Sequence, residues 1–243
     1  MRRFFRIMTG AILSSAVGLV LHADDLAGDI ARIHIEAIGG HDRVERLTSF
    51  RAAGAVRAGD NDMEFQMWSA RPNRIRIEIN RGAVTLVQGW DGENAPWLRE
   101  GDSGQLIDMK GQLAADFKAD SEFDDLLFKA RERGYSIEYA GEENMKDGAV
   151  VKLLVTRDAT DQSVLYLASD TYFVIRQDRT QRLLNGDVLK TQTYYDDFRP
   201  VLGVTLPHSI VVQSGEEILN QIALSWIEPN PPMDPNIFKK PSP

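Results

Sequence analysis

Apolar and polar side chains alternate along most of the chain beyond residue 49, as they do in β-strands that have one face buried. Between Met63 and Met67, polar Glu64 and Gln66 separate three apolar residues. Between residues 74 and 79, charged residues separate three isoleucines in the same way. The pattern predicts antiparallel strands with one face in water and the other against apolar groups.

The longest continuous run of this kind extends from Leu165 to His208. Within it, Asn185-Gly186 separates two β-rich segments. This is the strongest short signal for a β-hairpin, because both residues tolerate a positive φ. Asp170-Thr171 and Pro200 to Gly203 mark further turns. The whole stretch is therefore predicted to be an antiparallel meander.

Two regions depart from the alternation and are predicted to be helical. The first begins at Asp24 and ends at Gly39-Gly40, because acidic residues favour a helix start and glycines end a helix. Its apolar residues recur at helical spacing and are expected to share one face: Leu26, Ile30, Ile33 and Ala37. That face fits a helix packed on a core or a lid over an apolar cavity, and the pattern does not separate the two. Residues 113–118 and 122–133 are expected to form two further helices.

The apolar faces of the predicted strands are the candidate ligand site. They combine methionines and phenylalanine with isoleucines, and methionine adapts to irregular contents. An ordinary core filled by the helices would give the same pattern. The residues predicted to line the cavity are Met63, Phe65, Met67, Ile75, Ile77, Ile79, Val84, Leu86, Phe173 and Ile175.

The first 23 residues have the features of a secretory signal. A basic start with Arg2, Arg3 and Arg6 precedes an apolar run that ends at Leu21, and Ala23 follows as a cleavage position. The alternative is an uncleaved anchor, but a run of about 15 apolar residues is shorter than the roughly 20 that span a bilayer. We expect a mature protein of residues 24–243 that forms a single domain in the periplasm.

Charge and composition argue against several classes of function. The 243-residue chain has 28 Lys and Arg against 36 Asp and Glu, a net charge of −8. Residues 1–23 contain three arginines and no acid, so the remainder has 25 basic against 36 acidic residues, or −11. This acidity does not favour binding to nucleic acid. The chain has no cysteine, which excludes disulfides, a thiol nucleophile and cysteine metal ligands.

Motifs that would indicate catalysis are absent from the sequence. His34 and His41 are separated by the helix-breaking Gly39-Gly40, and neither H-E-x-x-H nor G-x-S-x-G occurs. The acidic pairs Asp124-Asp125 and Asp196-Asp197 are interpreted as capping or solvated residues and not as acid–base pairs. We therefore expect no catalytic residue, no metal site and no cofactor.

Several motifs resemble those of the periplasmic lipoprotein-sorting (LolA-like) family. They are Y-Y-D-D-F-R-P-V-L-G-V-T-L-P-H ending at His208, R-P-N-R-I-R-I-E-I from Arg71, V-Q-G-W-D-G from Val87 and N-P-P-M-D-P-N-I-F-K-K-P from Asn230. The resemblance implies a half-open antiparallel barrel that carries a lipid-like group, with the N-terminal helix over its opening. It does not identify the cargo.

Together these features predict an α+β fold, a strongly curved and half-open antiparallel β-barrel of about eleven strands with helices covering the concave face. The expected function is non-catalytic carriage or binding of a lipid, or of the acyl chains of a lipoprotein. We expect a monomer that meets partner proteins in the inner and outer membranes. The alternatives are an envelope sensor or interaction domain of the same fold that reports to a membrane partner, a hydrolase, and a structural envelope protein with a filled core.

Overall fold

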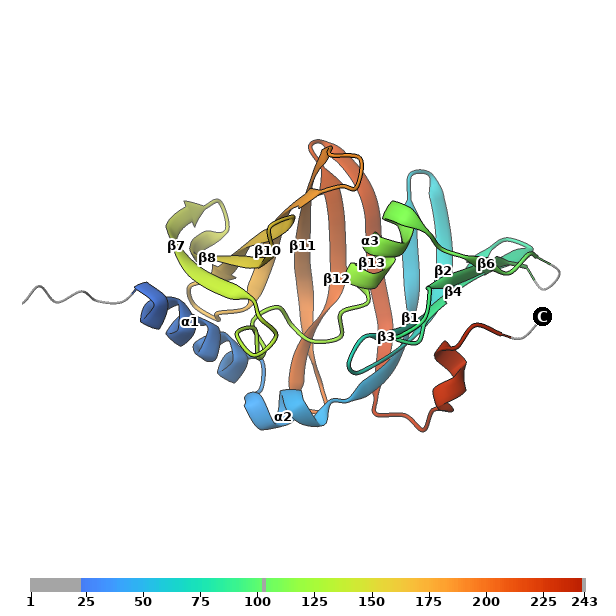
Figure 1. The fold of residues 1–243 in the computed structure, drawn as a ribbon. Coiled ribbons are helices and arrows are strands. Elements are labelled where there is room, and N and C mark those ends of the chain that lie inside the picture. Colours follow the sequence, from blue (N-terminus) through green and yellow to red (C-terminus); the bar gives the residue numbers. More distant parts are fainter. Residues whose placement is uncertain (1–22, 102–103, 242–243) are drawn as a thin grey trace, which may run out of the picture.

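The chain folds around a single antiparallel sheet (Figure 1). The computed structural model describes residues 23–101 and 104–241. Residues 1–22, which make up nearly all of the predicted secretory signal, lie outside the described residues. The strands are β1 Ser49–Ala58, β2 Asn61–Ala70, β3 Arg74–Arg81, β4 Val84–Trp90, β5 Trp97–Glu100, β6 Ile107–Asp108, β7 Ser136–Met145, β8 Gly148–Asp158, β9 Asp161–Ala168, β10 Val174–Arg182, β11 Val188–Val201, β12 Val204–Ser214 and β13 Glu217–Pro229. The helices are α1 Ala23–Ala37, α2 His41–Arg46, α3 Gly111–Asp120 and the 3-10 turn η1 Pro235–Phe238.

The sheet has 13 strands in the order β6-β5-β4-β3-β2-β1-β13-β12-β11-β10-β9-β8-β7. The first and last strands pair in its middle, and β6 and β7 form its two edges, so the sheet is curved but open. The expected count of about eleven is too low, because β5 and β6 have only four and two residues and show no alternation. With few helices beside this sheet, the fold is mostly β and not the predicted α+β.

The connection between the two edge strands, residues 109–135, crosses one face of the sheet and carries α3. We call this the inner face. Lys118 Nζ of α3 lies 5.3 Å from the centroid of the Trp90 ring, and Asp120 at its end pairs with Arg179 of β10 at 3.1 Å. Figure 1 shows the sheet curving around this connection. Helices therefore cover only part of the concave face.

Residues 122–133 do not form the predicted helix but a series of turns. The Asp125 side chain accepts a hydrogen bond from the Leu127 N–H at 2.7 Å, and Lys129 has a φ of 51°. The Arg133 guanidinium donates to the carbonyls of Asp125 and Leu126, which a helix would use internally. The apolar residues of this segment, such as Leu127 and Phe128, lie in turns and are buried in the core.

Helix α1 packs on the inner face of β7, β8 and β9 and forms part of the main core. Its buried face contains Ala27, Ile30, Ala31, His34 and Ile35, and Ile38 directly after the helix is buried as well. The predicted face was one position out of register: Ile30 is buried, Ile33 and Ala37 are half-buried, and Leu26 is 47% exposed. The end of the helix is fixed, since Thr205 N donates to Ile38 O at 2.7 Å.

A close approach of two backbones holds this helix end. Gly39 has a φ of 140°, and a Cβ at this position would lie 2.3 Å from the Gly203 carbonyl oxygen in the β11–β12 turn. Only glycine fits here. The Gly39-Gly40 pair therefore ends α1, as the sequence predicts, and also docks it.

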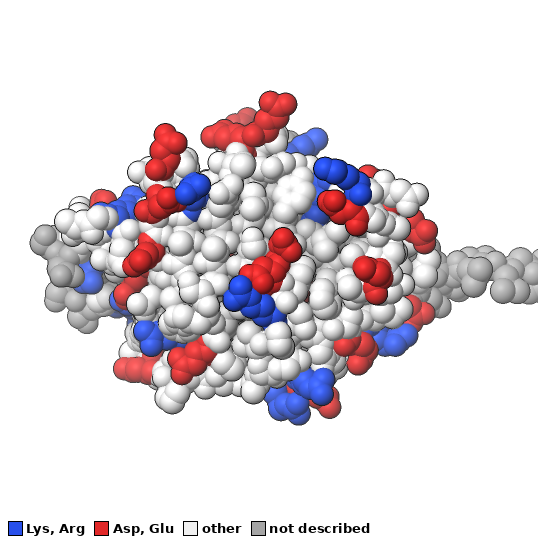
Figure 2. All heavy atoms as spheres, turned by 180° about the vertical axis from the view of Figure 1, so that it is seen from behind, with Lys and Arg blue, Asp and Glu red and all other residues white. Residues whose placement is uncertain are grey.

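The opposite, outer face carries the C-terminal segment. Trp97 Nε1 donates to Phe238 O at 3.1 Å, and Phe238 of η1 is 1% exposed. Arg76 of β3 donates to Ile237 O at 3.2 Å. Figure 2 shows the molecule from behind, with acidic and basic side chains scattered and uncharged surface between them. Among the helices of the described part of the chain, none is long and apolar enough to cross a membrane.

Candidate functional site

The register of β2, β3 and β4 places the predicted apolar residues of these strands on one face. Phe65 lies opposite Ile79, and Met67 opposite Ile77. Ile79 in turn lies opposite Leu86. Residues opposite each other on antiparallel strands project from the same side. Eight predicted residues therefore share the inner face: Met63, Phe65, Met67, Ile75, Ile77, Ile79, Val84 and Leu86.

The apolar surface continues onto strands that are distant in sequence. Val56 of β1 lies opposite Met63 on one side and Ile222 of β13 on the other, and Ile222 lies opposite Ile210 of β12. We call the inner face of β1–β4, β12 and β13 the apolar face. The alternation of apolar residues around Ile210, and again around Ile222, is visible in the sequence, but the pairing of β1 with β13 is not. Sequence reasoning therefore missed the part of the apolar face that lies on β12 and β13.

Phe173 and Ile175 do not belong to the apolar face. Strands β1, β13, β12 and β11 lie between β10 and the β2–β4 group. Phe173 precedes β10 and packs against Phe198, with ring centroids 4.9 Å apart, and against the α1 core. Ile175 lies at the irregular pairing between Val174 and Arg176. Their assignment to the ligand cavity stays a prediction, and the sequence could not place them relative to β2–β4 because strand order is not encoded locally.

Side chains on the apolar face are incompletely covered. Phe65 and Ile75 are buried, but Met67 and Ile77 are only half-buried and Val84 is 39% exposed. Helix α3 lies over this side of the sheet, and none of its residues is buried. A helix that fills a core buries one of its faces, as α1 does. Helix α3 therefore does not fill a core against the sheet in the way that α1 does.

Polar contacts attach the crossing connection to the sheet. Glu122 accepts from Arg133 and Arg157, both at 2.7 Å, and Asp161 lies 3.1 Å from Arg157 and 2.7 Å from Arg179. Asp120, at the exposed end of α3, is a further partner of Arg179 in this network, at 3.1 Å. The network connects residues 120–133 to β8, β9 and β10.

An ion pair between buried His34 and half-buried Asp125 joins α1 to the connection. His34 Nδ1 lies 2.8 Å from Tyr172 O, and His34 Nε2 lies 3.4 Å from Asp125 Oδ2, which is an ion-pair distance and long for a hydrogen bond. Burial alone lowers the pKa of His34, but the Asp125 carboxylate outweighs burial and raises the pKa above its ordinary 6.5. Burial likewise raises the pKa of Asp125, and His34 outweighs it, so that pKa is lowered.

This arrangement corrects the interpretation of Asp124-Asp125. Asp125 pairs with His34, and Asp124 forms an ion pair at 2.6 Å with Arg71. Neither residue caps a helix, because no helix begins there. Periodicity gives no signal for a pair between positions 34 and 125, since only the tertiary structure brings them together.

The other predicted polar residues do not converge on a reactive site. His208 Nδ1 lies 3.0 Å from Leu206 O, and the Asp196 carboxylate accepts from the next backbone N–H at 2.7 Å. Asp197 pairs with Arg199 at 2.5 Å. Within residues 23–101 and 104–241, no three His, Asp or Glu side chains come together as a metal ion would require.

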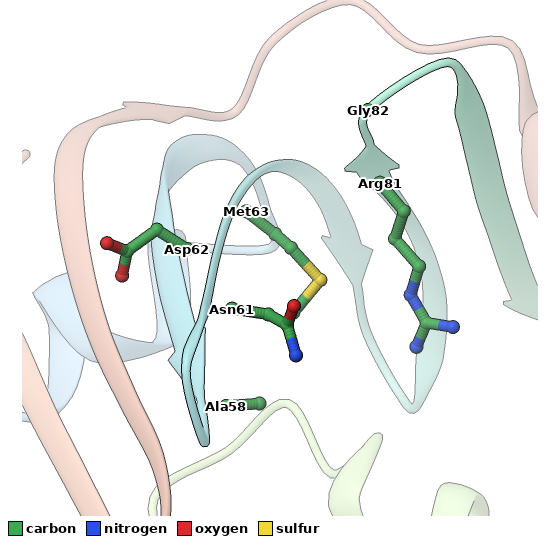
Figure 3. A pocket seen from close by; sticks show the side chains of 6 residues that line it. All are labelled: Ala58, Asn61, Asp62, Met63, Arg81 and Gly82. Carbon is green, nitrogen blue, oxygen red and sulfur yellow. The ribbon is translucent and has the colours of Figure 1, made fainter.

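A pocket opens at one end of the apolar face, between the β1–β2 and β3–β4 hairpins. Its volume is about 460 Å³, and its lining residues are Ala58, Asn61, Asp62, Met63, Arg81 and Gly82. Figure 3 shows Asn61, Met63 and Arg81 directed toward the space between the hairpins, whereas Asp62 points away. Met63 therefore connects the pocket to the apolar face.

Solved structures share this architecture over most of the chain. A DUF1329 family protein from Desulfovibrio piger aligns with a TM-score of 0.61 at 13% identity, over 89% of this chain and 97% of the other. A LolA superfamily protein from Nitrosomonas europaea aligns with a TM-score of 0.58 at 17% identity, over 88% and 97%. This chain has the LolA-like fold.

A third structure with the LolA-like fold is an outer membrane lipoprotein-sorting protein domain from Vibrio parahaemolyticus. It aligns with a TM-score of 0.61 at 10% identity, over 89% of this chain and 97% of the other. No protein-family model matches the sequence, and a search of curated proteins finds no match. At these identities the structural likeness establishes the LolA-like fold alone.

Proposed function

We propose that this protein binds and carries an acyl chain of a lipid or lipoprotein in the periplasm, without catalysing a reaction. The observation that carries the proposal is the half-covered apolar face beneath α3. A contiguous apolar surface that the protein covers only in part is unfavourable in water, so it is usually a binding surface. The periplasmic location rests on the predicted signal at residues 1–23 and on the LolA-like fold.

The dimensions of the apolar face suit one acyl chain. From Ile75 to Arg81 a strand rises about 20 Å. An acyl chain extends through one leaflet, about half of a hydrocarbon core roughly 30 Å thick. Each buried CH₂ is worth about 0.8 kcal/mol in either place. Loading and release are therefore near balance, and we propose that a monomer receives direction from partner proteins in the two membranes.

We propose α3 as the movable cover of this site. Its attachments are polar: Gln112 Oε1 accepts from Leu184 N at 2.7 Å, and Gln181 Nε2 donates to Asp116 at 3.3 Å. The first of these contacts is exposed and exchanges with water at little cost, and the second is long and partly buried. The lid role of α1 stays a prediction, and the burial of α1 is that of a fixed core helix.

Uptake of a fluorescent fatty acid tests the proposed function. Ile77→Trp places an indole on the apolar face and should block uptake while the protein stays folded. Asn80→Trp adds the same ring to the exposed, opposite face of β3 and should leave uptake unchanged. Equal uptake by both variants, or none by the wild type, would contradict the proposal. Native mass spectrometry of protein purified from its own envelope would then weigh the natural ligand.

The second candidate, an interaction domain that reports to a membrane partner, is favoured by one feature of the outer face. The Arg51 guanidinium lies 5.3 Å from the Trp68 ring centroid and 5.4 Å from that of Trp226, which is 39% exposed. Tryptophan and arginine are enriched at the centres of protein interfaces. Co-purification of a membrane protein that Trp226→Ala abolishes, with fatty-acid uptake unchanged, would support this candidate.

A further inference from the structure

The apolar rows of β2 and β3 both end in polar side chains. Alternate residues of a strand share a face. On β3 the row Ile75, Ile77, Ile79 therefore continues to Arg81, and on β2 the row Met67, Phe65, Met63 continues to Asn61. A guanidinium and an amide thus lie on the inner face, beyond the last apolar side chains, in the pocket between the hairpins. A surface with an apolar row that ends in polar groups matches an amphiphile, which has an apolar chain that ends in a polar head group.

The local charge of the pocket is positive in an acidic protein. Asp62 projects from the outer face and is already paired with Arg57, through Nε–Oδ1 at 2.6 Å and Nη2–Oδ2 at 2.9 Å. Glu100, opposite Leu86 on the inner face, is exposed and does not line the pocket. No described carboxylate lies within ion-pair distance of Arg81. Its charge is therefore available to a ligand.

We propose that Arg81 and Asn61 bind the anionic head group, a carboxylate or a phosphate, of a single-chain amphiphile whose acyl chain lies along Met63, Ile79 and Ile77. A guanidinium matches the geometry of both oxyanions, and the Asn61 amide adds a donor. The inference rests on the proposed function and specifies how the ligand is oriented in that site. The head group stays in the pocket between the hairpins, and the acyl chain enters the apolar face first.

Three ligands with one chain length test the head-group site by calorimetry near neutral pH: dodecanoate, dodecyl phosphate and dodecanol. Arg81→Gln should weaken binding of the two anions about threefold to tenfold and leave dodecanol unchanged. Arg81→Lys should retain most of the anion affinity. Arg182→Gln is the matched control, because Arg182 is an exposed arginine at the same end of the sheet, on the outer face. It should change none of the three affinities.

The outcomes separate this inference from the proposed function. If Arg81→Gln binds the anions as the wild type does, or weakens dodecanol equally, the head-group site is wrong while acyl binding stands. If the wild type binds none of the three ligands, the proposed function fails and this inference fails with it. A preference for dodecyl phosphate over dodecanoate that Arg81→Gln removes would identify a phospholipid type of head group, and the reverse preference a free fatty acid.

Discussion

Shortening Ile77 distinguishes an apolar face that binds a ligand from one that only fills a core. Ile77→Ala removes three carbons, each worth about 0.8 kcal/mol when fully buried. Ile77 is only half-buried and lies beneath a helix with no buried residue. The transfer term is thus incomplete and little new cavity forms. We expect a loss of about 1–2 kcal/mol in the free energy of unfolding.

Leu153→Ala is the matched control for a true core position. Leu153 of β8 is 0% exposed and belongs to the cluster that α1 covers. Its truncation should cost about 3–5 kcal/mol, because a cavity term is added to the transfer term. The two variants should therefore differ by at least about 1 kcal/mol, as measured by a urea titration followed by tryptophan fluorescence.

The same titration with a fatty acid present measures binding. A ligand at 100 times its Kd stabilises the folded state by about 2.7 kcal/mol. The wild type and Leu153→Ala should both gain this increment, and Ile77→Trp should not. The reasoning is refuted if Ile77→Ala costs as much as Leu153→Ala and no fatty acid stabilises the wild type. The apolar face would then be an ordinary core.

Three further predictions follow from other parts of the molecule. The pKa of His34 is raised above 6.5 in the folded state, so protonated His34 stabilises the fold fully below about pH 6.5, and this stabilisation is lost as the pH rises through the folded pKa. His34→Gln should therefore flatten the curve of unfolding free energy against pH above pH 6.5. An unchanged slope would argue against the His34–Asp125 pair. Cysteines at Asp116 and Gln181 joined by a short crosslinker should slow fatty-acid uptake if α3 moves, and reversal of the crosslink should restore it; the chain has no other cysteine. N-terminal sequencing of the envelope fraction should begin near Asp24, and recovery of Met1 would contradict export with cleavage.

Local information in the sequence determined the long strands, the principal hairpin and the two sides of β2, β3 and β4. Side chains alternate along a strand with a period of two, so the face that carries Ile77 can be predicted without knowing its neighbours. The Asn185-Gly186 hairpin and the Gly39-Gly40 helix end are likewise local, since they depend on backbone conformations that few residues adopt. The family motifs predicted the open, curved antiparallel architecture.

The tertiary structure alone decided which strands are neighbours and what covers them. The pairing of β1 with β13 joins residues more than 160 positions apart, and it places β13, β12 and β11 between β1 and β10. Helical periodicity indicated that residues 24–38 have an apolar side, but not that this side fills a core while α3 lies loosely over the apolar face. Such contacts form between segments with no local sequence relation, because packing and not backbone propensity selects them.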